Sequence, residues 1–268
     1  MAMFLRFLFF LFSFATASAV LCPRCEHEGK VSYFSKDSAL SSGACAYGSL
    51  ALDFNHGYVA AAASAIYTDG ALCGGCYRMR CKNKTLCRSQ GTTVIVTDQI
   101  SNGNKTDFVL SRKAYMALAK KGMGKQLLRR GAVDIEYKRY PCDFFNNKNL
   151  SLRVQESRRN PDYVALEVLY QGGQTEIKIF WVARYDSTNL IPLRRNHSAV
   201  WDIYNIPDWP LRLQFEVLQE SFSWHILAEN FIPVDGWKPG RIYDTGVQTT
   251  EYIGWESCSV PKCPEDGW

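Results

Sequence analysis

The sequence predicts an all-β protein made of two unlike halves. Eight of the ten cysteines lie at or before Cys142, in a part of the chain that is rich in glycine, alanine and serine. After Cys142 the sequence contains several strand-length apolar segments and few helix signals, and its cysteines are only Cys258 and Cys263. We therefore expect a cysteine-rich β-domain followed by a small β-sandwich that is stabilised by its apolar core.

The first residues have the features of a secretory signal peptide. Arg6 supplies a positive charge, an apolar run extends from Phe7 to about Phe14, and small residues follow at 17–19. The run is too short to span a bilayer of roughly 30 Å. A buried N-terminal helix is the alternative. We interpret residues 1–19 as a signal peptide and expect a secreted, extracellular protein that does not stay in a membrane.

Secretion decides how the cysteines are interpreted. An oxidising compartment favours disulfides. A zinc site is the alternative because Cys73-x-x-Cys76 has ligand-like spacing, but Cys45 and Cys142 would then lack partners. N-x-S/T triplets, which are glycosylation acceptors in secreted proteins, occur at Asn83, Asn104, Asn149 and Asn196. We expect disulfides, no metal and no cofactor.

Composition limits the possible partners. The chain has 31 lysines and arginines against 26 aspartates and glutamates, which gives a formal charge of +5. Such a mild surplus does not indicate a nucleic-acid partner. It is compatible with an acidic partner, such as a wall that contains pectin, although a solvated basic surface explains it as well.

Strands are expected in the first half at "TTVIVTD" (92–98) and "AVDIEYKRY" (132–140), which are β-branched or alternating. Between them, "SRKAYMALAKK" predicts a short helix with Ser111 as its N-cap. A polar linker, "DFFNNKN" (143–149), follows.

The second half contains four expected strands, at 163–170, 175–182, 211–218 and 222–228. In "LRLQFEVL" the odd positions Leu211, Leu213, Phe215 and Val217 are apolar, so one face of that strand is expected to be buried. The "GGQ" at 172–174 predicts a hairpin between the first two strands.

Several kinds of chemistry are not supported. No G-x-S-x-G elbow and no phosphate-binding glycine loop occurs, and the four histidines are scattered. A Ser–His or Cys–His nucleophile is therefore not expected. Asp98 follows the apolar "TVIV" and begins a polar loop that ends at Asp107; a turn-capping role is the alternative for Asp98.

Seven stretches of the sequence carry a resemblance to a known family. They are "SSGACAYGSL" (41–50), "CGGCYRMRC" (73–81), "VIVTDQ" (94–99), "FVLSRKAY" (108–115), "RRGAVDIEYKRYPC" (129–142), "NPDYVALEVLY" (160–170) and "WKPGRIYDTGVQ" (237–248). Together they resemble the expansins, and most closely the expansin-like A branch of plant wall proteins.

The resemblance implies a domain organisation. Residues 41–145 would form a six-stranded double-psi β-barrel similar to family-45 glycoside hydrolases. Residues 150–250 would form an immunoglobulin-like, carbohydrate-binding β-sandwich, and residues 251–268 a C-terminal extension. It also implies the disulfides Cys45–Cys73, Cys76–Cys142 and Cys81–Cys87. The pairing of Cys22, Cys25, Cys258 and Cys263 stays open.

The resemblance also implies a polysaccharide groove on the barrel. Expansins carry an aspartate in a His-Phe-Asp-Leu-Ser motif, and this chain has Val109 at that position and Asp107 in place of the histidine. Asp98 matches the family's other groove aspartate. Asp107 is expected to face the same side as Val109, some 6–7 Å away. Further positions expected to line the groove are Tyr33, Phe34, Asp37 and Tyr47.

Aromatic side chains on the sandwich are expected to form a carbohydrate-binding platform, because the faces of glucose rings are apolar and stack on aromatic rings. By resemblance the candidates are Tyr163, Trp201 and Trp237, with core packing as the alternative for each. His197 and Leu190 stand where relatives have aromatic residues, so we expect a shortened platform with weaker binding to cellulose.

These observations predict a monomeric, non-hydrolytic cell-wall protein that binds cellulose, hemicellulose or another matrix glucan and needs no catalytic residue. A weak endoglucanase that uses Asp98 and Asp107 is one alternative. A degenerate defence or signalling protein that no longer binds sugar is another.

Overall fold

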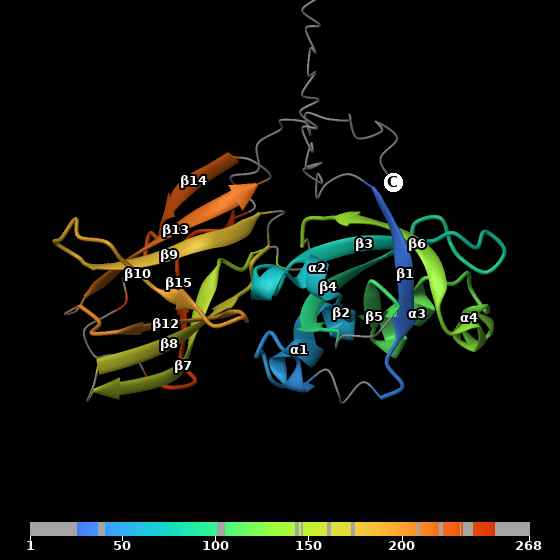
Figure 1. Ribbon diagram of the computed structural model, residues 1–268, viewed down its shortest axis with the longest axis horizontal. Coiled ribbons are helices and arrows are strands. Elements are labelled where there is room, and N and C mark those ends of the chain that lie inside the picture. Colours follow the sequence, from blue (N-terminus) through green and yellow to red (C-terminus); the bar gives the residue numbers. More distant parts are fainter. Residues whose placement is uncertain are drawn as a thin grey trace, which may run out of the picture.

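The computed structural model describes residues 26–36, 41–100, 105–142, 145, 147–159, 162–172, 175–207, 210–219, 222–230, 232 and 238–249. The predicted signal peptide, Asp37, Asn104, Trp237, the C-terminal extension and the four cysteines nearest the two ends lie outside the described residues. Figure 1 shows two domains side by side, a barrel on the right and a sandwich on the left. No helix in the described ranges is both long enough and apolar enough to cross a membrane.

The first domain is a closed six-stranded barrel with strand order β1-β5-β2-β4-β3-β6. Its strands are β1 (His27–Tyr33), β2 (Val59–Ala62), β3 (Cys76–Cys81), β4 (Thr92–Gln99), β5 (Phe108–Leu110) and β6 (Val133–Arg139). Two pairs are parallel, β1 with β5 and β2 with β4, and the other pairs are antiparallel. The predicted all-β, double-psi barrel is confirmed.

The predicted start of this domain at residue 41 is wrong, because β1 closes the barrel between β5 and β6. The sequence "HEGKVSY" of β1 hides this role. Val31 is the one fully buried residue of the strand, and charged or small residues surround it. A strand held mainly by main-chain hydrogen bonds to two neighbours gives little hydrophobic pattern to detect.

Short helices lie in three of the connections between the barrel strands. They are α1 (Leu50–Asp53), η2 (Phe54–Gly57), α2 (Ser64–Tyr67), η3 (Thr68–Gly70), α3 (Arg112–Ala117) and α4 (Gly124–Arg130). The predicted N-cap of α3 is confirmed, since the amide of Ala114 donates to Oγ of Ser111 at 3.2 Å. This bond satisfies one of the amides that a helix start leaves without an intrahelical partner.

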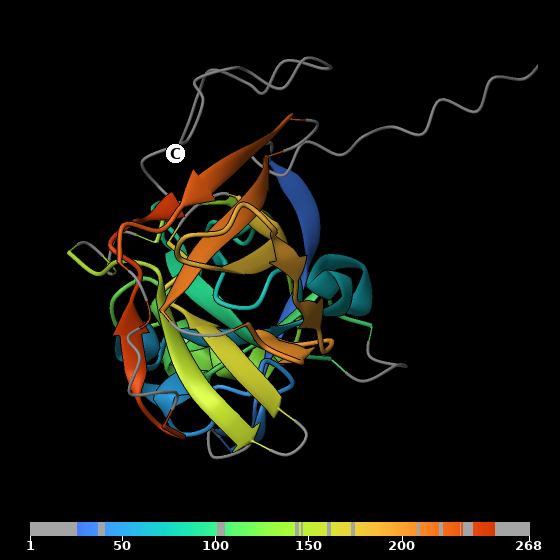
Figure 2. The same cartoon turned by 90° about the vertical axis from the view of Figure 1, so that its left-hand side faces the viewer.

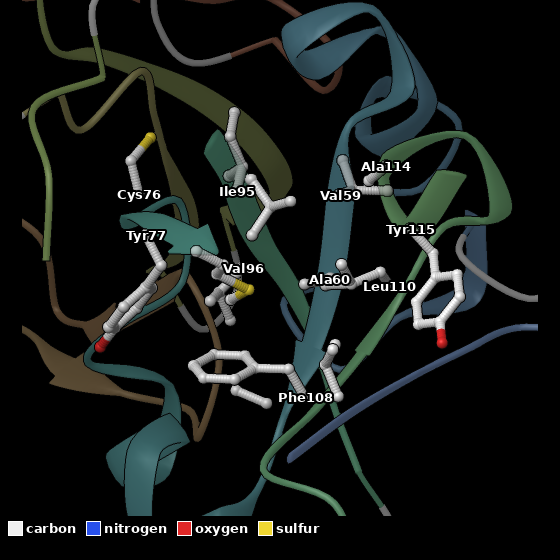
Figure 3. Packing of buried hydrophobic residues seen from close by; sticks show 14 of the residues in the cluster. Val59, Ala60, Cys76, Tyr77, Ile95, Val96, Phe108, Leu110, Ala114 and Tyr115 are labelled. Carbon is white, nitrogen blue, oxygen red and sulfur yellow. The ribbon is translucent and has the colours of Figure 1, made fainter. Parts of the chain in front are cut away.

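Alternation along β5 decides which side chains fill the barrel. Phe108 and Leu110 point into the core, where they meet Val59, Ala60 and Ile95 from neighbouring strands (Figure 3). Val109 lies between them and belongs to a separate cluster on the other face of the strand. The same pleat that buries Phe108 therefore presents position 109 on the outside of the barrel wall.

Within the described residues three disulfides hold the barrel together, and they are the three pairs that the resemblance implied: Cys45–Cys73, Cys76–Cys142 and Cys81–Cys87. The Cys76–Cys142 bond closes a loop of 66 residues, for which chain entropy gives a stabilisation of about 4 kcal/mol as an upper value. The segment that follows is more than a linker, because Phe145 is buried and packs edge-on against Phe54 and Tyr170.

The second domain is a sandwich of two antiparallel sheets, which confirms the predicted β-sandwich. One sheet has the order β10-β9-β13-β14 and the other β11-β12-β8-β7-β15. The strands are β7 (Ser151–Arg159), β8 (Asp162–Leu169), β9 (Glu176–Arg184), β10 (Ile191–Pro192), β11 (Arg194–Arg195), β12 (Val200–Tyr204), β13 (Leu211–Gln219), β14 (Phe222–Leu227) and β15 (Ile242–Asp244). Figure 2 shows the two layers, with yellow-green β7 and β8 in one and orange β13 and β14 in the other.

One prediction about the sandwich is confirmed and another is wrong. The odd positions of β13 are buried in the core, as its alternation predicts. The hairpin expected at "GGQ" does not form, since β8 pairs with β7 and β12 whereas β9 pairs with β10 and β13. The chain therefore passes from one sheet to the other between β8 and β9.

Three largely buried arginines join the two domains, and we call the contact they form the interdomain seam. Arg195 of the sandwich donates to the carbonyl of Gly70 at 3.1 Å, and Arg153 donates to the carbonyl of Tyr47 at 3.0 Å. Arg139 of the barrel donates to the carbonyl of Thr175 at 3.1 Å in the opposite direction. Burial lowers the pKa of Arg195 to about 10, which still leaves the guanidinium charged at neutral pH.

A buried carboxylate lies next to this seam. Glu167 is fully buried, and Nε of Arg153 and Nε2 of Gln155 donate to its Oε2 at 2.5 and 2.7 Å. Burial raises the pKa of Glu167, and the hydrogen bonds from Arg153 and Gln155 oppose that change. The pKa rises because removal from water disfavours the ionised carboxylate more than the two hydrogen bonds favour it.

Gly70 is expected to control the fit of the domains. It has a φ of +85°, and a Cβ atom there would lie 2.5 Å from the amide nitrogen of Ser198. Gly122 is a matched control, with a φ of +83° and no atom within 4 Å of its Cβ position. Gly122→Ala should cost about 1–2 kcal/mol for the left-handed backbone alone. Gly70→Ala should cost at least about 1 kcal/mol more, since the seam must also open.

Denaturant unfolding of both variants measures these losses, and small-angle scattering tests whether Gly70→Ala separates the domains. Equal losses in the two variants would show that the contact with Ser198 does not hold the domains together.

Glu167 should make stability depend on pH. Its pKa is higher in the folded state than in the unfolded chain, so above about pH 4.5 the folded state retains a proton that the unfolded chain has lost. The free energy of unfolding should therefore fall as the pH rises above that value. Glu167→Gln should reduce this slope in unfolding experiments between pH 4.5 and 7, and Glu156→Gln, at an exposed position on β7, should not. An unchanged slope in Glu167→Gln would contradict this assignment.

Candidate functional site

A row of four residues crosses the outside of the barrel and contains Asp98. Register pairs Ser32 of β1 with Val109 of β5, Val109 with Ala61 of β2, and Ala61 with Asp98 of β4. Residues in register on neighbouring strands share a face of the sheet. We call the surface around this row the Asp98 face. It brings together the two positions at which the resemblance implies groove carboxylates.

Asp98 is half-buried at the end of β4, and the backbone fixes its position. Its Oδ1 accepts hydrogen bonds from the amides of Ala44 and Gln99 at 2.7 and 2.8 Å. Gly43 lets the chain approach this closely, because a Cβ atom there would lie 2.5 Å from the carbonyl oxygen of Thr97. Beside Asp98, Nε2 of Gln99 donates to Oγ of Ser64 at 2.9 Å, and both side chains are exposed. Polar groups of this kind suit a ligand rich in hydroxyls.

The position at which the resemblance implies a second groove aspartate is apolar. Val109 is 7% exposed and forms a cluster with Ala61 and Ile100. Phe34 is half-buried and packs against the same cluster, so this predicted residue does lie beside the row. A valine can neither transfer a proton nor accept a hydrogen bond. Because it is also buried, Val109 gives this surface neither a charge nor a hydrogen bond.

The prediction that Asp107 faces the same side as Val109 is wrong. Asp107 lies in a bend that precedes β5, where strand alternation does not apply. Its Oδ2 accepts a hydrogen bond from the amide of Lys30 at 2.7 Å and occupies space that Gly29 leaves open. Burial, with a smaller effect of Asp107, raises the pKa of Tyr137 to about 12. Asp107 therefore belongs to the β1–β6 side of the barrel.

There Asp107 lines a hollow of about 510 Å³ together with charged side chains of both signs, which are Glu28, Lys30, Lys82, Lys105 and Asp134. Neither Asp98 nor Val109 lines it. Asp98 and Asp107, the two carboxylates of the alternative endoglucanase mechanism, therefore contact different residues.

A further groove prediction is wrong, because the side chain of Tyr47 packs inside the domain, whereas Tyr33 is half-buried against α3 and α4. Tyr33 is the last residue of β1, its ring lies 4.9 Å from that of Tyr115, and its hydroxyl donates to the carbonyl of Leu128 at 3.2 Å. Tyr47 is 2% exposed and packs edge-on against Phe54. Burial raises the pKa of Tyr47 well above its ordinary value. Tyr33 thus packs against α3 and α4, and the carbonyl of Tyr47 accepts the hydrogen bond from Arg153 at the interdomain seam.

Trp201 was predicted as a platform residue and is instead part of the sandwich core. It is 3% exposed and packs edge-on against Phe180, and the guanidinium of Arg195 lies 4.3 Å from its ring centre. Along β12, Trp201 and Ile203 point inward, so Val200, Asp202 and Tyr204 point outward. No face of the Trp201 ring is available to a sugar.

Tyr163 does lie on the outer face of this sheet, but another ring covers it. Tyr163 is 9% exposed, and its ring centre is 4.7 Å from that of Tyr204, its partner in register on β12. Tyr204 is 50% exposed. Sequence reasoning missed Tyr204; the signal was the alternation of "VWDIY", which places Tyr204 outward once Trp201 is inward. Arg194 and Asp202 form an ion pair beside the two rings.

The Asp98 face and this outer sheet face meet at the interdomain seam. Residues 43–47 run between them, since Ala44 contacts Asp98, the carbonyl of Cys45 accepts from the amide of Ala199 at 3.4 Å, and Tyr47 contacts Arg153. His197 is exposed at the same junction, with Nδ1 3.7 Å from a carboxylate oxygen of Asp69. The two faces are thus linked by short contacts between the domains.

Three of the predicted glycosylation positions fall within the described residues. Asn196 is exposed between β11 and β12, whereas Asn83 and Asn149 are half-buried. Oδ1 of Asn83 accepts from the amides of Thr85 and Leu86. Their modification stays a prediction. Among the described residues, no group of three or more His, Cys, Asp or Glu side chains could hold a metal ion.

Comparison with known proteins identifies both domains. Residues 59–137 match a family model described as lytic transglycolase, and residues 150–233 match the expansin C-terminal domain. The Arabidopsis thaliana proteins expansin-like A2 and expansin-like A3 are each 46% identical to this chain, with 94% of either chain covered. Expansin-like A1 of the same plant is 45% identical over 96% of this chain and 95% of its own.

Solved structures share the arrangement of two domains. The crystal structure of the expansin of Clavibacter michiganensis superposes with a TM-score of 0.61 at 20% identity, covering 83% of this chain and 97% of that one. A point mutant of the same bacterial protein, solved in complex with cellohexaose, superposes with a TM-score of 0.62. The identity and coverage of the Arabidopsis relatives show that this chain belongs to the expansin family, in its expansin-like A group.

Proposed function

We propose that this chain is a secreted, non-hydrolytic cell-wall protein that binds cellulose or a matrix glucan along a surface extending from Asp98 to Tyr204. One observation carries the proposal: the Asp98 face holds a carboxylate that the backbone fixes beside the exposed polar side chains of Gln99 and Ser64. The bacterial relative in complex with cellohexaose supports a glucan as the ligand.

Binding follows from the chemistry of the two faces. Glucose rings have apolar faces that stack on aromatic rings and shed water, and their hydroxyls lie around the edge. Tyr204 offers an exposed ring with Tyr163 beneath it, and Asp98, Gln99 and Ser64 offer hydrogen-bonding groups. Because β12 rises about 3.3 Å per residue, Tyr204 lies about 13 Å along the strand from Val200 at the seam. A chain of several sugars would be needed to bridge these contacts.

Hydrolysis is not part of the proposal, because an inverting glycosidase needs an acid and a base about 6.5–9.5 Å apart. Val109 supplies neither, and the carboxylate of Asp107 is held by the amide of Lys30 on the β1–β6 side. A mechanical effect on the wall would then arise from competition for noncovalent glucan contacts, with no bond broken.

Secretion to the cell wall rests on three further observations. Residues 1–19 have the pattern of a signal peptide. The described part of the barrel contains three disulfides, and such bonds persist in oxidising compartments. The relatives with the names expansin-like A1, A2 and A3 belong to a family of wall proteins.

Tyr204→Ala should weaken binding to insoluble glucan about 3- to 10-fold, because a stacked ring contributes roughly 0.5–1.5 kcal/mol beyond its buried area. Tyr185→Ala is a matched control, since Tyr185 is 54% exposed and also belongs to the sandwich. Pull-down on insoluble wall fractions measures both. Equal binding by the two variants would show that Tyr204 does not contribute to glucan binding. Absence of binding by the natural protein would favour a defence or signalling role.

Creep of heat-inactivated wall strips under load tests the role of position 109. The natural protein should produce little extension and release no reducing ends. Val109→Asp should extend the strips at least twofold faster, whereas Val109→Asn, similar in size and uncharged, should not. Strong extension by the natural protein would show that a carboxylate at this position is unnecessary, and shortened oligosaccharides would favour the endoglucanase alternative.

A further inference from the structure

A second surface of the barrel has a distinctive charge. Between Asp107 and Asp134 the sequence contains no acidic residue, and it contains seven of the chain's 31 lysines and arginines. Six of these define what we call the basic helical face, which consists of Lys113, Lys120, Lys121, Lys125, Arg129 and Arg130. All six are exposed.

The fold gathers these residues on one part of the barrel. Helices α3 and α4 pack against each other. Together they lie at the end of the barrel away from the sandwich (Figure 1). Lys120 donates to the carbonyl of Lys84, which brings one more exposed lysine beside them. Lys113 donates to the carbonyl of His56 at 2.7 Å.

Acidic side chains do not neutralise this face. In the described part of the barrel, the salt bridges between side chains of opposite fixed charge join Lys30, Arg80 and Lys82 to Glu26, Glu28, Asp134 and Glu136. None involves the basic helical face. Asp134, the first acidic residue after α4, contacts Lys30 at 3.6 Å. The positive charge of the helices is thus presented to solvent.

Local stability does not account for this distribution. Lys113 and Lys125 lie in the first turns of α3 and α4, which contain no acidic residue and where the helix dipole disfavours positive charge. Lys125 and Arg129 are four residues apart on α4, a spacing at which like charges repel. Only Arg129 and Arg130, in the last turn, complement the dipole. The charges are therefore better explained by a partner than by the helices.

We propose that the basic helical face binds a linear polyuronate, an acidic polysaccharide whose repeated carboxylates are ionised above roughly pH 4. This inference rests on the proposed location in the cell wall. An anionic membrane fits less well, because Tyr115, Leu127 and Leu128 turn into the barrel and Met116 is the one exposed large hydrophobic side chain of the described α3–α4 segment. A single-stranded nucleic acid would need exposed rings for base stacking, and no large exposed aromatic side chain occurs in this segment.

The test compares two fourfold variants of the full-length secreted protein that lose the same charge. The patch variant is Lys121→Gln, Lys125→Gln, Arg129→Gln and Arg130→Gln. The control variant is Lys178→Gln, Arg184→Gln, Lys238→Gln and Arg241→Gln, all exposed positions of the sandwich. Calorimetry measures binding to a polyuronate with free carboxylates, to the fully methyl-esterified form of the same polymer, and to polyglutamate. Unfolding midpoints confirm that both variants fold.

The natural protein should bind the free polyuronate, and salt should weaken this binding because it screens exposed charges. The patch variant should bind at least tenfold more weakly, and the control variant less than threefold. Equal losses in both would show an effect of net charge alone, and equal binding of the esterified polymer or of polyglutamate would exclude a polyuronate site. Binding to neutral glucan is a separate readout that depends on Tyr204, so failure of either proposal can be recognised without the other.

Discussion

The hydrogen bonds from buried arginines to backbone carbonyls across the interdomain seam are the constraint on which the rest of the molecule depends. Arg195, Arg153 and Arg139 each reach the other domain. A carbonyl oxygen of the other domain fixes the place of each guanidinium group by a directional hydrogen bond, and Arg153 also pairs with the buried Glu167 of its own domain. Gly70 makes the approach possible, since any larger residue would meet the backbone at Ser198.

This constraint places two chemically different surfaces next to each other. The Asp98 face belongs to the barrel and the Tyr163–Tyr204 pair to the sandwich, and neither domain alone could contact a long polymer at both. Because residues 43–47 touch Asp98 at one end and Arg153 at the other, the position of Asp98 is coupled to the domain contact. A polymer bound along both faces would meet a surface whose spacing is set before binding, which lowers the entropic cost of association.

The pleat of two short strands decides the chemistry of these surfaces. In β5 the need to bury Phe108 and Leu110 turns Val109 outward, and in β12 the need to bury Trp201 and Ile203 turns Tyr204 outward. A large aromatic residue contributes most to stability in the core. Trp201, the predicted platform residue, is therefore buried, and Tyr204 on the same strand is the exposed aromatic residue. Charge is separated in a similar way, with Asp98 on one side of the barrel and the cations of α3 and α4 at its far end.

The sequence by itself determined the elements that have a local cause: the N-cap of α3 at Ser111, the alternating strand β13 and the cysteine-rich first half. Its resemblance to expansins also supplied the two domains and the disulfide pairs. Contacts between residues far apart in the chain decided the rest. Asp107 turned toward Lys30 because a bend interrupts its strand. Tyr47 was buried against Phe54, and Trp201 against Phe180 on another strand. β1 joined the barrel through main-chain pairing. Local physics fixes which residues prefer a strand or a helix, but the side of each strand that faces a sugar depends on packing partners that only the tertiary structure brings together.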